Sequence, residues 1–132
     1  MKKRIEALAR IAKLQGRLHD LKQARVAALE QERAGLSDEL GAVFEALSSG
    51  DLAYGAQAKL SARHARAVET RIAALARARD ETRDQARAHG MRAKLAGRAA
   101  DAAERKRRDM EERKALADLV ERSIGRRDAS ST

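Results

Sequence analysis

The sequence lacks cysteine, proline and tryptophan, and its 132 residues include one Phe and one Tyr. Without cysteine the chain can form no disulfide, thiol nucleophile or Cys-based metal site. Two aromatic residues and 14 leucines are too few to fill a globular core of ordinary composition, which argues against a compact enzyme fold. Without proline, the residue that breaks helices most strongly is missing.

Alanine, arginine and other charged residues make up most of what is present. The chain has 30 Ala and 21 Arg, and 37% of its residues are charged. This composition is typical of long helices and coiled coils, so we expect an all-α protein. The net charge is +9, and residues 59–108 hold 15 basic and 6 acidic side chains. Such an excess is compatible with nucleic acid, anionic lipid or an acidic protein as partner.

Apolar residues recur at the alternating spacing of three and four that marks a coiled-coil seam. Two phases are expected in the first helix, with a shift of one residue between Ala28 and Leu29. The first phase comprises Ile11, Leu14, Leu18, Leu21 and Ala28, and the second comprises Leu29, Leu36, Leu40, Val43 and Leu47. In the second helix the periodic pattern comprises Leu60, Val68, Ile72, Leu75, Thr82, Ala86, Ala93, Ala96, Ala100, Ala103, Met110, Ala117 and Ile124.

A cluster of turn and cap residues, Ser48-Ser49-Gly50-Asp51, separates the two helical patterns. A short loop between long helices predicts an antiparallel two-helix coiled-coil hairpin with an overhanging C-terminal helix. Position i would then pair with about 99 minus i, so that residues beyond Ala96 project past the first helix. The expected layout is a hairpin over 1–125, with helices at 3–47 and 52–124, a turn at 48–51 and a flexible tail at 126–132. Four residues are expected to close the hairpin tip: Phe44, Leu47, Leu52 and Tyr54.

The projecting part of the second helix keeps an apolar stripe that the hairpin cannot cover. Met110, Val120 and Ile124 continue the seam, and Leu116 and Leu119 flank it. Exposed aliphatic residues at helical spacing usually mark an interaction face. Homodimerisation, or a bend at Gly90 or Gly97 that folds the overhang back, would cover the same stripe.

No pattern in the chain points to catalysis, a metal or a cofactor. The three histidines are not at ligand spacing, and the carboxylates lie on solvated helix without an apolar pocket. Gly50 to Gly55 lacks the lysine that a phosphate-binding loop needs. The basic run from Arg105 to Arg108 favours a solvated helix with nearby carboxylates, and nonspecific nucleic-acid binding stays an alternative. Charged residues interrupt every apolar run, so we expect a soluble cytoplasmic protein without membrane insertion.

The arrangement of a first arm, a short turn, a longer second arm and a charged amphipathic end resembles the FliJ family of flagellar export proteins and its type III secretion relatives. The best local match runs from Arg105 to Arg122 and includes Leu116-Ala117-Asp118. The resemblance implies an antiparallel coiled coil similar to the central stalk of rotary ATPases. It also implies binding to the export ATPase ring, the export gate and export chaperones. The implied contact residues are Met110, Glu112, Arg113, Lys114, Leu116, Leu119 and Val120.

These observations favour a non-enzymatic component of the flagellar or type III protein export apparatus. It would be cytoplasmic and peripheral at the inner membrane through that apparatus. The alternatives are a basic helical nucleic-acid-binding protein using residues 59–108 and a homodimeric structural coiled coil. The sequence leaves open whether the export system would be flagellar or of the virulence type.

Overall fold

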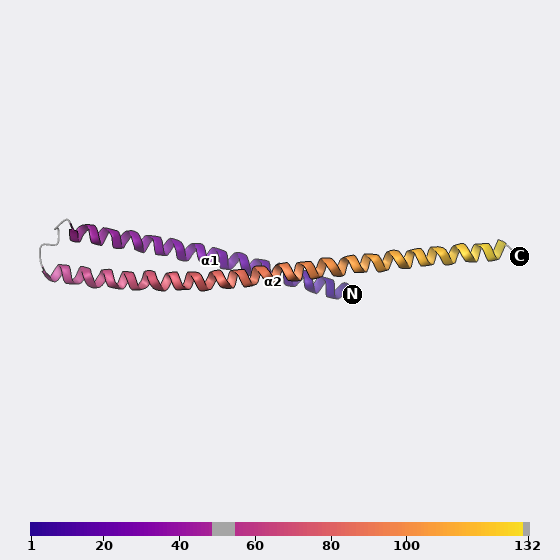
Figure 1. Cartoon of the computed structure of the whole chain (residues 1–132), viewed down its shortest axis with the longest axis horizontal. Helices are drawn as coiled ribbons and strands as arrows, with labels where there is room; N and C mark the ends of the chain where they lie inside the picture. Colours follow the sequence, from indigo (N-terminus) through magenta and orange to yellow (C-terminus); the bar gives the residue numbers. More distant parts are fainter. Residues whose placement is uncertain (49–54, 131–132) are drawn as a thin grey trace. The chain divides into compact units, whose positions relative to one another are not determined.

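The computed structural model describes residues 1–48 and 55–130, with side chains over residues 1–48 and 61–129. These residues form two helices, α1 (Lys2–Ser48) and α2 (Gly55–Ser130), and the described ranges contain no strand (Figure 1). The all-α class predicted from composition is therefore confirmed for this part of the chain. Alanine and arginine are strong helix formers, and no proline interrupts either helix.

Neither α1 nor α2 has a stretch that is both long and apolar enough to cross a bilayer, within the residues that the structure describes.

The helix ends differ from those expected. α2 continues through Gly125 to Ser130, so the tail predicted from residue 126 is helical as far as the description reaches. One glycine costs a helix only about 1 kcal/mol, and Arg127 in the last turn complements the negative end of the helix dipole. Residues 49–54 lie outside the described part, and with them Leu52, Tyr54 and most of the expected turn.

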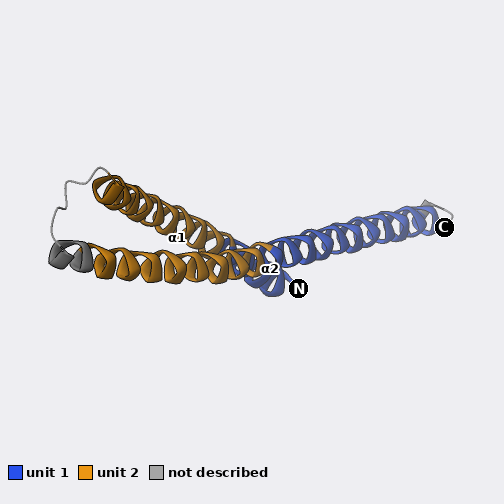
Figure 2. Cartoon of the chain, turned by 60° about the vertical axis from the view of Figure 1, so that its left-hand side comes forward, with its two compact units in different colours: residues 1–15, 91–132 blue, residues 16–90 orange. Residues whose placement is uncertain are grey.

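The chain divides into two compact units (Figure 2). Unit 1 comprises Met1–Gln15 and Met91–Thr132, and unit 2 comprises Gly16–Gly90. Each unit contains a segment of α1 and a segment of α2. The buried residues of unit 2 are Val26, Leu29, Ala65, Val68, Leu75 and Ala86, and those of unit 1 are Ala96 and Ala100.

The seam of α1 keeps one uninterrupted heptad phase, and the first phase predicted from the sequence is wrong by one residue. Ile11, Leu14 and Leu21 were expected in the seam, but they are 48%, 56% and 66% exposed. Ala28 is exposed as well, and Leu18 alone of this phase is half-buried. An unbroken phase needs no local change in helix winding, and the helix adopts it although polar residues then enter the seam. In unit 1 the covered positions at this spacing are Ile5, Leu8, Ala12 and Gln15; in unit 2 they are His19, Lys22, Val26, Leu29, Arg33, Leu36, Leu40, Val43 and Leu47.

The seam predicted for α2 is confirmed between Val68 and Ala103, where all the predicted positions are buried or half-buried. The side chain of Leu60 lies outside the description. Beyond this range, Met110, Ala117 and Ile124 continue the pattern and are exposed, as expected for a part of α2 that the hairpin does not cover. Alanine dominates the covered positions of α2, and its small side chain allows a neighbouring backbone to approach closely.

Gly90 and Gly97 offer a matched pair for testing helix packing. A Cβ added at Gly90 would lie 3.2 Å from Nδ1 of His19, whereas one added at Gly97 would meet nothing within 4 Å. We therefore expect Gly97→Ala to raise the free energy of unfolding by about 0.5–1 kcal/mol through helix propensity alone. Gly90→Ala should gain less or lose stability because the imidazole must move.

Urea unfolding followed by circular dichroism measures both variants. An equal gain at the two positions would contradict the close packing of His19 on Gly90.

Candidate functional site

The end of α2 is the part of the described chain with the largest continuous exposure. Every residue from Arg108 to Ala129, here called the C-terminal arm, is exposed. The projecting segment was expected to begin after Ala96, but Ala96 and Ala100 are buried and Arg107 is half-buried. The expected pairing of position i with position 99 minus i places Glu39 opposite position 60. In the structure Glu39 bonds to His64, four residues further along α2.

The C-terminal arm carries five exposed large apolar side chains. Leu116, Val120 and Ile124 are 65%, 50% and 55% exposed and follow one another at four-residue spacing, so they form a ridge along one face. Ala117 lies beside this ridge. Leu119 is 66% exposed and Met110 is 52% exposed, and both lie on neighbouring faces. The arm therefore presents an apolar surface to solvent over several turns.

The contact residues implied by the FliJ resemblance all lie on the C-terminal arm and are all exposed, but they do not share one face. Arg113 precedes Leu116 by three residues and Leu116 precedes Val120 by four, which places this trio together. Glu112 and Leu119 lie on the other side of Leu116. The list of implied contacts omitted Ile124, although the apolar stripe in the sequence already included it.

Met110 and Lys114 belong to a separate surface hollow near the start of the arm. Met1, Arg107 and Glu111 complete its lining. Two of the five lining residues are methionines, whose flexible side chains adapt readily to different partner shapes.

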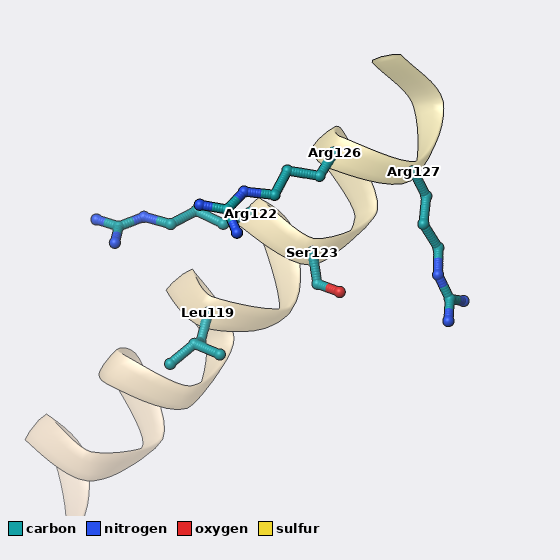
Figure 3. A pocket seen from close by; sticks show the side chains of 5 residues that line it. All are labelled: Leu119, Arg122, Ser123, Arg126 and Arg127. Atoms are coloured by element: carbon teal, nitrogen blue, oxygen red, sulfur yellow. The ribbon is translucent and has the colours of Figure 1, made fainter. Parts of the chain in front are cut away.

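Three arginines and Leu119 line a surface hollow at the far end of the arm, a feature that sequence reasoning missed. Its lining residues are Leu119, Arg122, Ser123, Arg126 and Arg127. Figure 3 shows Arg122 and Arg126 extending to the same side of the helix, while Arg127 points away from them. The four-residue spacing of Arg122 and Arg126 was the available signal. This hollow adds positive charge beside the apolar ridge.

An ion-pair cluster marks the base of the arm. Arg107 donates from Nη2 to Oε1 of Glu104 and from Nη1 to Oε1 of Glu111, each at 2.6 Å. The hydrogen bond from Arg107 holds the pKa of Glu104 below its ordinary value. Nε of Arg108 lies 3.5 Å from Glu104. Half of the basic run from Arg105 to Arg108 is thus paired along its own helix.

In unit 2, polar bonds join α1 to α2. Oε1 of Glu30 accepts from Nη1 of Arg79, and Oε2 accepts from Nη2 of Arg33 at 3.0 Å. Nδ1 of His19 donates to the carbonyl oxygen of Ala86 at 2.7 Å. Further pairs link Arg71 to Glu32 at 3.0 Å and His64 to Glu39 at 2.8 Å.

Glu30 gives unit 2 a pH dependence of known sign. Hydrogen bonds from Arg79 and Arg33 lower the pKa of its carboxyl from the ordinary 4.5. A lowered folded-state pKa adds stability that is present above the unfolded pKa and is lost as the pH falls through the folded one. We therefore expect Glu30→Gln to lower the melting temperature near neutral pH and to weaken its fall in acid.

Melting curves followed by circular dichroism from neutral pH to about pH 3 measure this effect. Glu69→Gln is the matched control because Glu69 is exposed and makes no ion pair among the described residues. Identical acid profiles for Glu30→Gln and wild type would contradict the role of Glu30.

Two of the four residues expected at the hairpin tip, Phe44 and Leu47, lie in the described part of the chain. Leu47 is half-buried at a seam position, whereas Phe44 is 49% exposed. Phe44 follows the seam residue Val43 directly and lies at the edge of the seam, and the other two residues expected at the tip, Leu52 and Tyr54, lie outside the described residues. In the described part of the chain, no group of three or more His, Asp and Glu side chains could hold a metal ion.

The helices, their heptad seams and the exposed C-terminal arm define a protein of the coiled-coil class. Comparison of the chain with protein families, curated proteins and solved structures gives no match.

Proposed function

We propose that this chain is a non-enzymatic coiled-coil protein that docks to a partner protein through its C-terminal arm. One observation carries the proposal: the arm is helical and exposed from Arg108 to Ala129, and it presents the ridge of Leu116, Val120 and Ile124. An isolated helix is marginally stable in water, and a contiguous apolar surface usually marks a binding site. A protein groove that covers the ridge would supply the missing packing.

The two helices form an antiparallel hairpin in this proposal. The contacts within unit 2 support it, because positions that ascend along α1 meet positions that descend along α2. His19 bonds to Ala86, Glu32 to Arg71 and Glu39 to His64. Successive partners in this order are typical of antiparallel pairing.

The partner that we propose is the ATPase ring of a flagellar or type III export apparatus. The resemblance to the FliJ family, centred on Arg105 to Arg122, supports this assignment. α1 has 47 residues and α2 has 76, which agrees with the unequal arms of that family's stalk-like coiled coil. The export gate and export chaperones would be further partners, at the cytoplasmic side of the inner membrane.

The direct test is binding of the purified full chain to the purified export ATPase and to the cytoplasmic part of the export gate, measured by co-purification and by interferometry. Binding to either supports the assignment, and binding to neither contradicts it. Light scattering of the chain alone tests the competing homodimer, in which the arms of two copies would cover each other.

A further inference from the structure

The positive charge of the chain is concentrated in one part of unit 1. Residues 1–15 and 91–108 carry 12 basic and 3 acidic side chains, a net charge of +9 that equals that of the whole chain. Residues 16–90 carry 12 basic and 11 acidic side chains, and residues 109–132 carry 5 and 6. Unit 2 and the C-terminal arm are therefore almost neutral.

Most of this charge is not neutralised within the described chain. In unit 2, Glu30, Glu32 and Glu39 pair with basic side chains on α2. In residues 1–15 and 91–108, Arg107 and Arg108 have carboxylate partners. By contrast, the following side chains are exposed and make no ion pair among the described residues: Arg4, Arg10, Lys13, Arg92 and Lys94.

Aliphatic side chains are exposed among these cations. Ile11, Leu14 and Leu95 are 48%, 56% and 61% exposed. Each directly precedes a covered seam position, which places all three on the same flank of the seam in the antiparallel pair proposed above. Two exposed cations lie on this flank, because Arg4 precedes Ile11 by seven residues and Arg92 precedes Leu95 by three. We call this surface the basic-apolar face: Arg4, Ile11, Leu14, Arg92 and Leu95.

We propose that the basic-apolar face binds an acidic amphipathic helix of another protein. The aliphatic side chains would pack against the apolar stripe of that helix, and the surrounding cations would pair with its carboxylates. The inference rests on the antiparallel pairing but not on docking of the C-terminal arm. It also gives a use to Ile11, Leu14 and Leu95, which the seam leaves exposed within residues 1–15 and 91–108.

The charge and the apolar groups of this face favour an acidic amphipathic helix over a second copy of the chain or nucleic acid. A second copy would bring two surfaces of the same strong positive charge together, which electrostatic repulsion opposes. Nucleic acid would satisfy the cations but would desolvate Ile11, Leu14 and Leu95 against phosphates, and no aromatic side chain is available there for base stacking. An acidic amphipathic helix matches both the charge and the apolar groups.

The test uses the full chain and two synthetic helical peptides of about 28 residues, a length sufficient for helicity in water. Both peptides carry the same leucine stripe, and their polar face consists of glutamate in one and lysine in the other. Fluorescence anisotropy should show binding of the glutamate peptide alone. The affinity should fall as NaCl rises from about 50 mM to about 500 mM, because the screening length shortens.

Two variants locate the binding surface. Leu14→Asp combined with Leu95→Asp should weaken binding of the glutamate peptide at least about tenfold, because charged groups then face its apolar stripe. Arg4→Glu combined with Arg92→Glu should reverse the preference towards the lysine peptide. Phe44→Asp is the control: it alters an exposed apolar residue of unit 2, far along α1 from the face, and should leave peptide binding unchanged.

The proposal is overturned if the two peptides bind equally or if the Leu14 and Leu95 double variant binds as wild type does. It is also overturned if the glutamate peptide does not bind while duplex DNA or phosphatidylglycerol vesicles do. A chain that binds the glutamate peptide but not the export ATPase would refute the proposed function alone.

Discussion

Replacing Leu116 and Leu119 together by aspartate should reduce binding to the export ATPase at least about 100-fold. The two leucines are 65% and 66% exposed on the C-terminal arm, so the chain loses no internal packing when they change. In a complex their side chains would be buried, and each aspartate would then place a charge in an apolar contact. Interferometry with immobilised ATPase measures the loss.

The control for this experiment is Leu21→Asp, which changes a leucine of the same 66% exposure in unit 2. It should bind as wild type does. Circular dichroism should show the same helix content and melting temperature for all three proteins. Full retention of binding by the Leu116 and Leu119 double variant would contradict docking through this part of the arm.

Truncating the seam leucines Leu29 and Leu75 to alanine should lower the free energy of unfolding by about 2–4 kcal/mol each. Both side chains are only 3% exposed and lie in unit 2. Their loss removes buried apolar area and leaves a cavity that long helices fill poorly. In a protein with a small core, each single change should lower the urea midpoint strongly.

Leu14→Ala and Leu21→Ala are the controls for the truncations of Leu29 and Leu75. The apolar pattern of the sequence places these two leucines in the seam, whereas the structure leaves them 56% and 66% exposed. Their truncation should change stability by no more than about 0.5 kcal/mol. If they cost as much as Leu29→Ala, the heptad phase of α1 seen in the structure would be refuted.

The seam of α2 could be predicted from the sequence because Val68, Ile72 and Leu75 start a heptad that the alanines continue without competition. In α1 two apolar rows lie side by side, one through Ile11 and Leu14 and one through Leu8 and Ala12. Hydrophobicity favours the first row, since its residues are larger. The structure covers the second row, because this row continues in phase with the seam from Val26 to Leu47. His19 and Lys22 then occupy covered positions.

The apolar residues of the candidate site could be predicted from the sequence, but the limits of the site could not. The leucines and valine of the C-terminal arm stand out in a sequence with few large apolar residues, and their four-residue spacing is visible without coordinates. The point at which the arm becomes exposed was not predictable, because it depends on the offset between the helices and hence on where α2 begins. The basic-apolar face depends on contacts between residues about 80 positions apart, which no local pattern encodes.

The sequence by itself determined the all-helical class, through its lack of proline and its wealth of alanine and arginine. It also determined the apolar character of the arm. Tertiary structure decided which of two rows on α1 is covered, where the exposed arm starts at Arg108, and which cations find carboxylate partners. The physical reason is that helix formation depends on neighbours within one turn, whereas burial and ion pairing depend on which positions the other helix covers.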